Sequence, residues 1–248
     1  MPDIAEHWLR RNHFLLRRLH SLTGIIPVGV FLVNHLYTNS LAWLSPARFD
    51  EHVLWLGSLP YLIFVETLGI FAPLAFHAGY GVVIARTGQA NVREYAYVDN
   101  WRYTLQRVTG WIALAFILIH LGHYRFAHWF GGTEFQHAVG AGASPFAITR
   151  SGMFGGMGAT LWFGLYGIGL IASVFHLANG VCTFCITWGI TVGMQSRRAV
   201  SAVAGALGLL LVTWGFLSLY GLGTRNAPPK SDGKAHAASA WRGEVSHG

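Results

Sequence analysis

Five long apolar stretches are the feature of this sequence that most constrains its fold. They lie at about residues 22–44, 59–85, 108–130, 154–178 and 199–222. A helix needs about 20 apolar residues to cross the hydrocarbon core of a bilayer. Only 11% of the residues are charged, whereas soluble domains reach roughly one quarter. The pattern predicts an all-α integral membrane bundle of five transmembrane helices.

The same pattern predicts the domain boundaries. We expect residues 1–223 to form one transmembrane domain. Residues 224–248 mix Pro, Gly, Ser, Ala and charged residues, which is typical of a flexible tail. The fourth stretch stays free of formal charge as far as residue 192, which is too long for one span and too short for two. We therefore expect one span with a helical or interfacial extension before Arg197.

Basic residues near the span ends predict the orientation, because loops rich in Lys and Arg stay in the cytoplasm. Ten arginines fall on the side of the N-terminus: Arg10, Arg11, Arg17, Arg18, Arg86, Arg93, Arg102, Arg107, Arg197 and Arg198. The opposite side holds three: Arg48, Arg125 and Arg150. We expect a multi-pass protein of the cell inner (cytoplasmic) membrane, with the N-terminus cytoplasmic and the C-terminus outside. The net charge of +7 then reflects topology and lipid contact, with no nucleic-acid partner.

Four histidines lie inside four different spans, where a polar side chain is costly and usually functional. They are His35, His77, His120 and His176, and the fifth stretch has none. A b-type heme with two axial imidazoles takes one from each side of the porphyrin. Four histidines on four helices are the number that two stacked hemes require. For any single one of them, a buried imidazole bonded to a neighbouring helix is an equally good interpretation.

Depth in the membrane sorts these histidines into two pairs, because a helix rises about 1.5 Å per residue. His35 and His120 lie 17 and 13 residues beyond the arginines that open their spans, which places both in the outer half. His77 lies nine residues before the basic end of its span, and His176 about 22 residues after the outer start of its own. Both therefore lie near the cytoplasmic side. We call His77 and His176 the inner pair, and His35 and His120 the outer pair.

A series of short motifs accompanies the histidines over roughly residues 14–195. In chain order they are RRLHSL (17–22) leading to Pro27, NHL (34–36), FHAGYG (76–81), LQRVTG (105–110), IH (119–120), FHLANG (175–180) and TWGI (187–190). In this order the series resembles the five-helix, di-heme cytochrome b membrane-anchor subunit of succinate dehydrogenase and fumarate reductase. The tail after about residue 224 lies outside the resemblance.

The resemblance implies the same pairing of histidines. It implies a proximal heme b held by His77 and His176, and a distal heme b held by His35 and His120. It also implies flavoprotein and iron–sulfur partner subunits on the cytoplasmic face. This subunit would do no dicarboxylate chemistry, but would anchor the complex and pass electrons between the iron–sulfur subunit and a membrane quinone, menaquinone or another.

Three polar residues at the cytoplasmic span ends suit the propionates of a heme. His20 and Ser21 open the first span, and Arg107 opens the third. Cationic and hydroxyl donors bind carboxylates well, and the resemblance supports a propionate or pocket role for His20 and Ser21. For Arg107, anchoring on the cytoplasmic side is an equally good interpretation.

Two further residues and two other protein classes stay open. Glu66, in the outer half of the second span, is a candidate quinone and proton site, with a structural acid as the alternative. His123 shares a helix face with His120 and is the substitute ligand. Another redox class would be a di-heme anchor of formate dehydrogenase or hydrogenase, or a b561-like transmembrane electron carrier. A transporter without heme is the third class, but only Glu66 lies well within a span.

Overall fold

The computed structural model describes residues 4–127, 135–154 and 158–227, which form helices and connections without any strand in those ranges. Five helical segments there are long and apolar enough to cross a membrane: Arg11–Leu44, Leu62–Thr87, Val98–Tyr124, Ala159–Thr187 and Met194–Thr224. The prediction of an all-α bundle of five transmembrane helices is confirmed. Most of the expected tail, from residue 228 on, lies outside the described residues.

The first span consists of two helices that meet at a proline. α1 (Ile4–Ile25) leads directly into α2 (Pro27–Leu44). Pro27 has no amide hydrogen and is tolerated in the first turn of a helix. The Ile26 amide still donates to the Leu22 carbonyl at 2.9 Å. The two helices therefore follow one another as a nearly continuous rod, which begins well before the apolar stretch in the sequence.

The second span changes helix type along its length. It begins as α4 (Leu62–Phe64), continues as the π-helical segment η1 (Val65–Phe71) and ends as α5 (Ala72–Thr87). Tyr61, directly before it, has a left-handed backbone with φ 60°. Segments of π-helix often occur at functional sites. Glu66, the candidate proton site, lies in this one.

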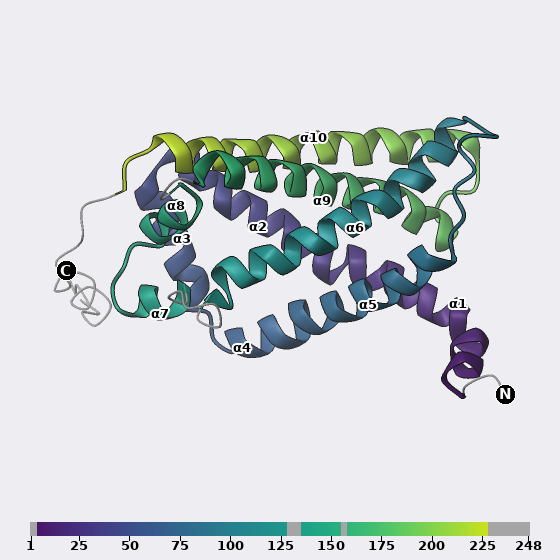
Figure 1. Ribbon diagram of the computed structural model, residues 1–248, viewed down its shortest axis with the longest axis horizontal. Helices are drawn as coiled ribbons and strands as arrows, with labels where there is room; N and C mark the ends of the chain where they lie inside the picture. Colours follow the sequence, from purple (N-terminus) through teal and green to yellow (C-terminus); the bar gives the residue numbers. More distant parts are fainter. Residues whose placement is uncertain (1–3, 128–134, 155–157, 228–248) are drawn as a thin grey trace, which may run out of the picture.

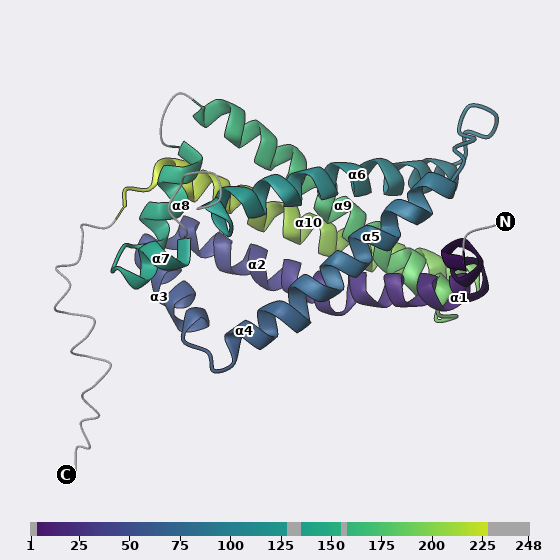
Figure 2. The ribbon, with the colours of Figure 1, turned by 60° about the horizontal axis from the view of Figure 1, so that its bottom comes forward.

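The other three spans are α6 (Val98–Tyr124), α9 (Ala159–Thr187) and α10 (Met194–Thr224). α10 packs along α2 and α9, α6 packs along α9, and α1 packs along α5 (Figures 1 and 2). The extension expected after the fourth stretch is the last part of α9, which continues to Thr187. A short connection that contains Gly189, at φ 72°, then leads to α10.

Three short helices gather at the end of the bundle opposite the start of α1 (Figures 1 and 2). They are α3 (Pro46–Gly57), α7 (Phe135–Gly140) and α8 (Pro145–Phe154), in segments that the sequence analysis treated as outer loops. Asp50 joins two of them, because its carboxylate accepts the Phe146 amide at 2.6 Å and the Ser144 hydroxyl at 2.5 Å. A compact core forms here, which includes Ala42, Phe49, Phe146, Met153 and Leu222.

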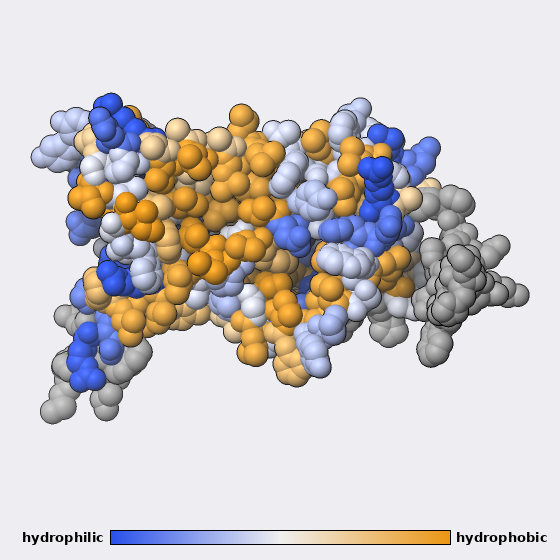
Figure 3. Space-filling model, turned by 180° about the vertical axis from the view of Figure 1, so that it is seen from behind, coloured by the Kyte–Doolittle hydropathy of each residue, from blue (hydrophilic) through white to orange (hydrophobic). Residues whose placement is uncertain are grey.

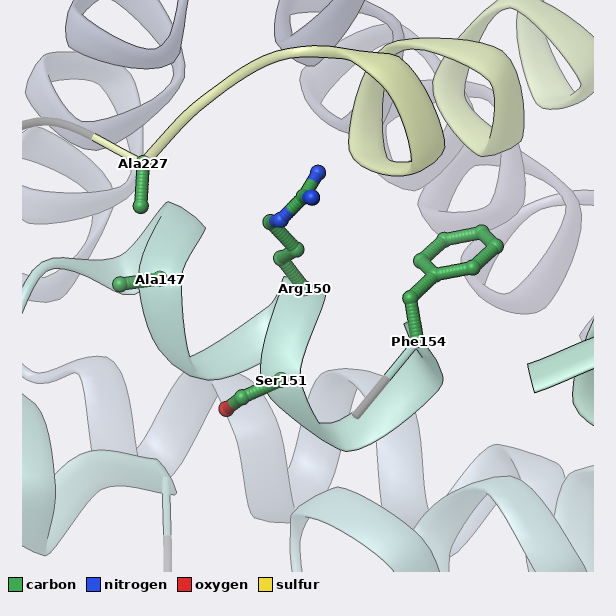
Figure 4. Close-up of a pocket in the computed structure, with 5 residues that line it drawn as sticks. All are labelled: Ala147, Arg150, Ser151, Phe154 and Ala227. Atoms are coloured by element: carbon green, nitrogen blue, oxygen red, sulfur yellow. The ribbon is translucent and has the colours of Figure 1, made fainter. Parts of the chain in front are cut away.

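Arg150 on α8 connects the three short helices, which we call the cap, to the end of α10. Its Nη1 donates to the carbonyl oxygens of Leu222 and Arg225 at 2.8 and 2.6 Å. The last carbonyls of a helix have no partner within the helix, and a cation there is favourable. Figure 4 shows the guanidinium in a hollow whose other lining residues are Ala147, Ser151, Phe154 and Ala227. Arg150 therefore fills this hollow in order to cap the C-terminal end of α10, and we assign the hollow no ligand.

The surface carries the apolar residues that a lipid-embedded bundle needs. Figure 3 shows apolar residues across the middle of one face, with polar residues mostly toward the two ends. Large apolar side chains such as Leu68, Leu118, Leu161 and Leu209 are exposed. Because lipid tails are as apolar as leucine, such exposure carries no penalty in a bilayer. A smaller interior cluster of Leu36, Leu170, Val174, Leu177 and Leu211 joins α2, α9 and α10.

Candidate functional site

The inner pair meets inside the bundle. The ring centres of His77 on α5 and His176 on α9 lie 6.1 Å apart, with ring planes 86° apart. The Nδ1 atoms of His77 and His176 lie 2.8 Å from the His20 carbonyl oxygen and 3.0 Å from the Gln106 carbonyl oxygen. A carbonyl oxygen only accepts hydrogen bonds, so both Nδ1 atoms carry the hydrogen. In the neutral rings, Nε2 is then free to bind a metal.

His20 lies flat against His77. The ring centres are 4.0 Å apart and the planes differ by 8°. Its Nδ1 donates to the His77 carbonyl oxygen at 3.0 Å, so the two residues bind each other twice and join α1 to α5. The sequence placed His20 at the mouth of a heme pocket, and the structure brings it against one imidazole of the inner pair.

The outer pair meets near the end that carries the short helices. The ring centres of His35 on α2 and His120 on α6 lie 5.6 Å apart, with planes 77° apart. Phe31 contacts the ring of His35 at 5.4 Å, and Phe116 contacts that of His120 at 5.8 Å. The Nδ1 atom of His120 lies 3.3 Å from the Tyr166 hydroxyl. Within the part of the chain that the structure describes, neither ring donates to a backbone carbonyl.

His123, the substitute ligand, lies beside the outer pair. Its Nδ1 lies 3.1 Å from the same Tyr166 hydroxyl. Its ring stacks on Trp162, with centres 4.3 Å apart and planes 19° apart. The structure therefore brings His120, and not His123, into ring contact with His35.

Three helices give the same spacing between the two pairs. Gly110 contacts His176 and lies ten residues before His120 on α6, and Tyr166 contacts His120 and lies ten residues before His176 on α9. On the α1–α2 rod, Gly24 contacts His77 and lies 11 residues before His35. At 1.5 Å per residue, each count separates the pairs by about 15 Å along the bundle.

Glycines face both rings of the inner pair. A Cβ on Gly24 would lie 2.2 Å from Cε1 of His77, and a Cβ on Gly110 would lie 3.0 Å from Cε1 of His176. The first distance is far below van der Waals contact. Small residues let helices approach closely in a membrane. These two positions bring α1 and α6 against the imidazoles.

Polar atoms without partners lie at the end of the bundle where the first and third spans begin. Arg18 Nε, Ser21 Oγ and Arg107 Nε are buried and accept or donate no hydrogen bond among the described residues. The guanidinium of Arg107 also lies 3.4 Å above the Tyr103 ring. Buried polar groups are nearly always satisfied. Unsatisfied donors of this kind suit an anionic group such as a carboxylate.

Glu66 forms an ion pair. Its Oε2 accepts Nη2 of Arg125 at 3.0 Å, and each side chain is about one fifth exposed. The pair joins η1 to the residue that follows α6. The structure thus brings the candidate proton site to a cation that the sequence analysis counted only for orientation.

Metal-ligating side chains come in pairs. Among the described residues, no three His, Cys, Asp or Glu side chains converge in a way that could hold a metal ion. A porphyrin supplies four ligands itself, and the protein adds only the axial ones. Two imidazoles on opposite helices are the number of protein ligands that porphyrin iron would need.

Comparisons with known proteins bear on this arrangement. No family model matches the chain. Over 188 residues it is 38% identical to the succinate dehydrogenase cytochrome b558 subunit of Bacillus subtilis (strain 168), in an alignment that covers 75% of this chain and 86% of that protein. The chain belongs to the succinate dehydrogenase cytochrome b family. The resemblance drawn from the motif series is confirmed, and the five apolar helices make this family member a membrane anchor in an enzyme complex.

Four further residues contact the histidines or their neighbours in this family member, and the sequence did not identify them as site residues. They are Arg102, Gln106 and Asn179 near the inner pair, and Tyr166 between His120 and His123. Polar residues inside an apolar span are a signal for function. Gln106 and Asn179 stood in the quoted motifs, but their spacing along the chain does not say which of them meet.

Proposed function

We propose that this member of the succinate dehydrogenase cytochrome b family holds two b hemes and passes electrons between an iron–sulfur subunit and membrane quinone. The iron–sulfur and flavoprotein subunits would sit on the cytoplasmic face of the inner membrane, and the flavoprotein would carry out the succinate–fumarate chemistry. Heme iron supplies one-electron redox chemistry when bound. The observation that carries the proposal is the meeting of four imidazoles in two pairs inside the bundle.

The spacing of the rings supports axial ligation. Metal–imidazole bonds are about 2.0 to 2.1 Å long and a ring centre lies about 1 Å beyond the nitrogen, so two rings that share a metal need centres about 6 Å apart. The inner pair measures 6.1 Å and the outer pair 5.6 Å. His77 and His176 would hold the proximal heme, and His35 and His120 the distal heme.

Hydrogen bonds to the other ring nitrogen support the inner pair further. Metal-ligating histidines usually donate their second N–H to a carbonyl or carboxylate, which orients the ring and raises its basicity. His77 and His176 donate in this way to His20 and Gln106. Both rings are therefore oriented by the main chain of a neighbouring helix.

The unsatisfied polar atoms supply sites for the propionates. Ser21 Oγ and Arg107 Nε are buried and have no partner among the residues that the structure describes, and a carboxylate would accept a hydrogen bond from either. His20 would line the pocket, because its ring stacks on His77. In this proposal Ser21 and Arg107 orient the proximal heme by its charged edge.

Glu66 is proposed as the proton site for quinone, menaquinone or another, beside the outer pair. Reduction of a quinone consumes protons, and a carboxylate in the outer half of the bundle can relay them. The ion pair with Arg125 would hold the Glu66 carboxylate in place at this level. Its exposed fraction of 21% leaves it in contact with the surroundings.

Purification in mild detergent tests the proposal. A pyridine hemochrome assay should find about two b hemes per chain. A flavin-containing subunit and an iron–sulfur subunit should co-purify. A colourless protein would refute the heme sites, and a heme protein that reproducibly lacks both partners would refute the complex.

A further inference from the structure

A relay of polar side chains connects α10 and α6 to His176. Arg102 Nη1 donates to Ser201 Oγ at 3.3 Å, and Arg102 Nε donates to Asn179 Oδ1 at 2.8 Å. Asn179 Nδ2 donates to Gln106 Oε1, also at 2.8 Å. Gln106 Nε2 then donates to the carbonyl oxygen of His176 at 3.1 Å. We call Arg102, Asn179 and Gln106 the inner relay.

The chemistry of the groups fixes the direction of the inner relay. A guanidinium only donates hydrogen bonds, so the oxygen of Asn179 must face Arg102. The amide nitrogen of Asn179 must then face Gln106, and that of Gln106 must face His176. Three successive donors thus point from the cation toward the histidine, and such chains polarise one another. Asn179 Nδ2 also donates to the Arg102 carbonyl, at the longer distance of 3.4 Å. Asn179 is 6% exposed, so its own side chain is shielded from water, while Arg102 and Gln106 are partly buried.

The inner relay reaches the imidazole through one residue. Gln106 meets His176 twice: its side chain donates to the His176 carbonyl, and its own carbonyl accepts Nδ1–H of the ring at 3.0 Å. The two bonds hold α6 and α9 at one register at this level. If the side chain of Gln106 turned away, the His176 carbonyl would lose its bond to α6, and the bond from the ring to the Gln106 carbonyl would alone fix this level.

We propose that Asn179, braced by Arg102, is a positioning residue that fixes the plane of the His176 imidazole through Gln106. The inference rests on the proposed function, because the orientation of an axial imidazole matters only if His176 ligates heme iron. Asn179 does not touch the iron in this proposal. It keeps the planes of the inner pair close to perpendicular, as the angle of 86° indicates.

Asn179→Leu in the purified complex tests the inference. The electron paramagnetic resonance of a ferric low-spin heme depends on the angle between its two imidazole planes, and the largest g value is highest when they are perpendicular. The largest g value of one of the two heme signals should fall or spread, with both hemes retained and the other signal unchanged. A His77→Ala variant, which keeps only the outer heme, identifies which signal is which.

Two companion variants make the result specific. Asn179→Asp keeps the acceptor for Arg102 but loses the N–H that reaches Gln106, so it should shift the same signal. Asn39→Leu is the matched control, because Asn39 donates to the carbonyl of His35 at 2.7 Å in the outer layer. It should leave the signal of the inner heme unchanged.

An unchanged inner signal in Asn179→Leu would overturn the inference, and so would an equal change in both signals, which indicates general loosening. If Asn179→Leu does not assemble, Arg102→Gln, which removes only the brace, should produce a smaller shift of the inner signal. An unchanged signal there would overturn the inference as well. A wild-type protein without heme would instead refute the proposed function.

Discussion

The inner and outer pairs use the same ligand type but are supported in different ways. In the inner pair, both rings donate to backbone carbonyls of neighbouring helices, and glycines press against both. In the outer pair, phenylalanines flank the rings, and His120 contacts a tyrosine hydroxyl. A backbone carbonyl cannot move unless its helix moves, whereas a hydroxyl rotates and can both donate and accept.

This difference indicates that the imidazole rings are held rigidly in the inner pair and adjustably in the outer pair. We expect the inner pair to tolerate little change in helix packing, since its hydrogen-bond acceptors are main chain. We expect the outer pair to respond to single side chains instead. The Tyr166 hydroxyl is shared by His120 and His123, and an ion pair that includes Glu66 lies on the same side of the bundle.

The largest effect is expected from His77→Ala. Heme content should fall from about two to about one per chain, because the outer pair does not depend on His77 for a ligand. The pyridine hemochrome assay measures it. His123→Ala is the control and should retain both hemes. Loss of a heme in that control would show that the outer layer uses His123 and would break the symmetry of the two pairs.

Gly24→Ala should destabilise the helix packing around the inner pair and leave the outer pair unaffected. The added Cβ would meet His77 at 2.2 Å, and overpacking of this kind costs about 1–3 kcal/mol. Thermal unfolding of the purified complex, followed by heme absorbance, should show a lower midpoint and earlier loss of the inner heme. Gly79→Ala adds the same atom on α5, where no atom of the described residues lies within 4 Å, so it should behave as the wild type. Equal midpoints for the two variants would contradict the packing argument.

Glu66→Gln should affect quinone chemistry at the outer end and leave both hemes in place. Loss of a proton-transferring group lowers a rate by on the order of a hundredfold. Succinate-dependent reduction of a soluble quinone analogue measures the change. Arg125→Gln breaks the same ion pair but keeps the carboxylate, so it should lower the rate much less. If the two variants lose activity equally, Glu66 serves the ion pair and not proton transfer.

Tyr166→Phe should give the smallest effect. It removes one hydroxyl that contacts His120 and His123, and a hydrogen bond of this kind contributes about 0.5–1.5 kcal/mol. A redox titration should show a small shift in the midpoint potential of the outer heme, with the inner heme unchanged. Tyr220→Phe, at an exposed position on α10, is the control. A shift confined to the inner heme would reverse the assignment of the layers.

Much of the bundle could be predicted from the sequence because hydropathy and helix rise are local properties. The five spans follow from apolar runs, and the meeting of His77 with His176 and of His35 with His120 follows from residue counts. The short helices of the cap could not be predicted in this way. They depend on contacts such as that of Asp50 with Ser144, which are 94 residues apart.

Arg102 shows how far the role of a single charged residue can be predicted from the sequence. From the sequence it is one of ten arginines that indicate the cytoplasmic side. In the structure its side chain turns inward to Asn179, 77 residues away, and braces the inner relay. Glu66 is similar, since its partner Arg125 is 59 residues away. Charge counts predict topology in either case, but they do not say which charges face the interior.

The sequence by itself determined that the chain is helical, that it crosses the membrane five times and that its four intramembrane histidines lie at two depths. Each conclusion depends on residue type and on distance along one helix. Only the tertiary structure decided what holds the imidazoles of His77, His176 and His120. That support comes from carbonyls, glycines and a hydroxyl on other helices, and the packing of helices, not the order of residues, brings these groups within hydrogen-bonding distance.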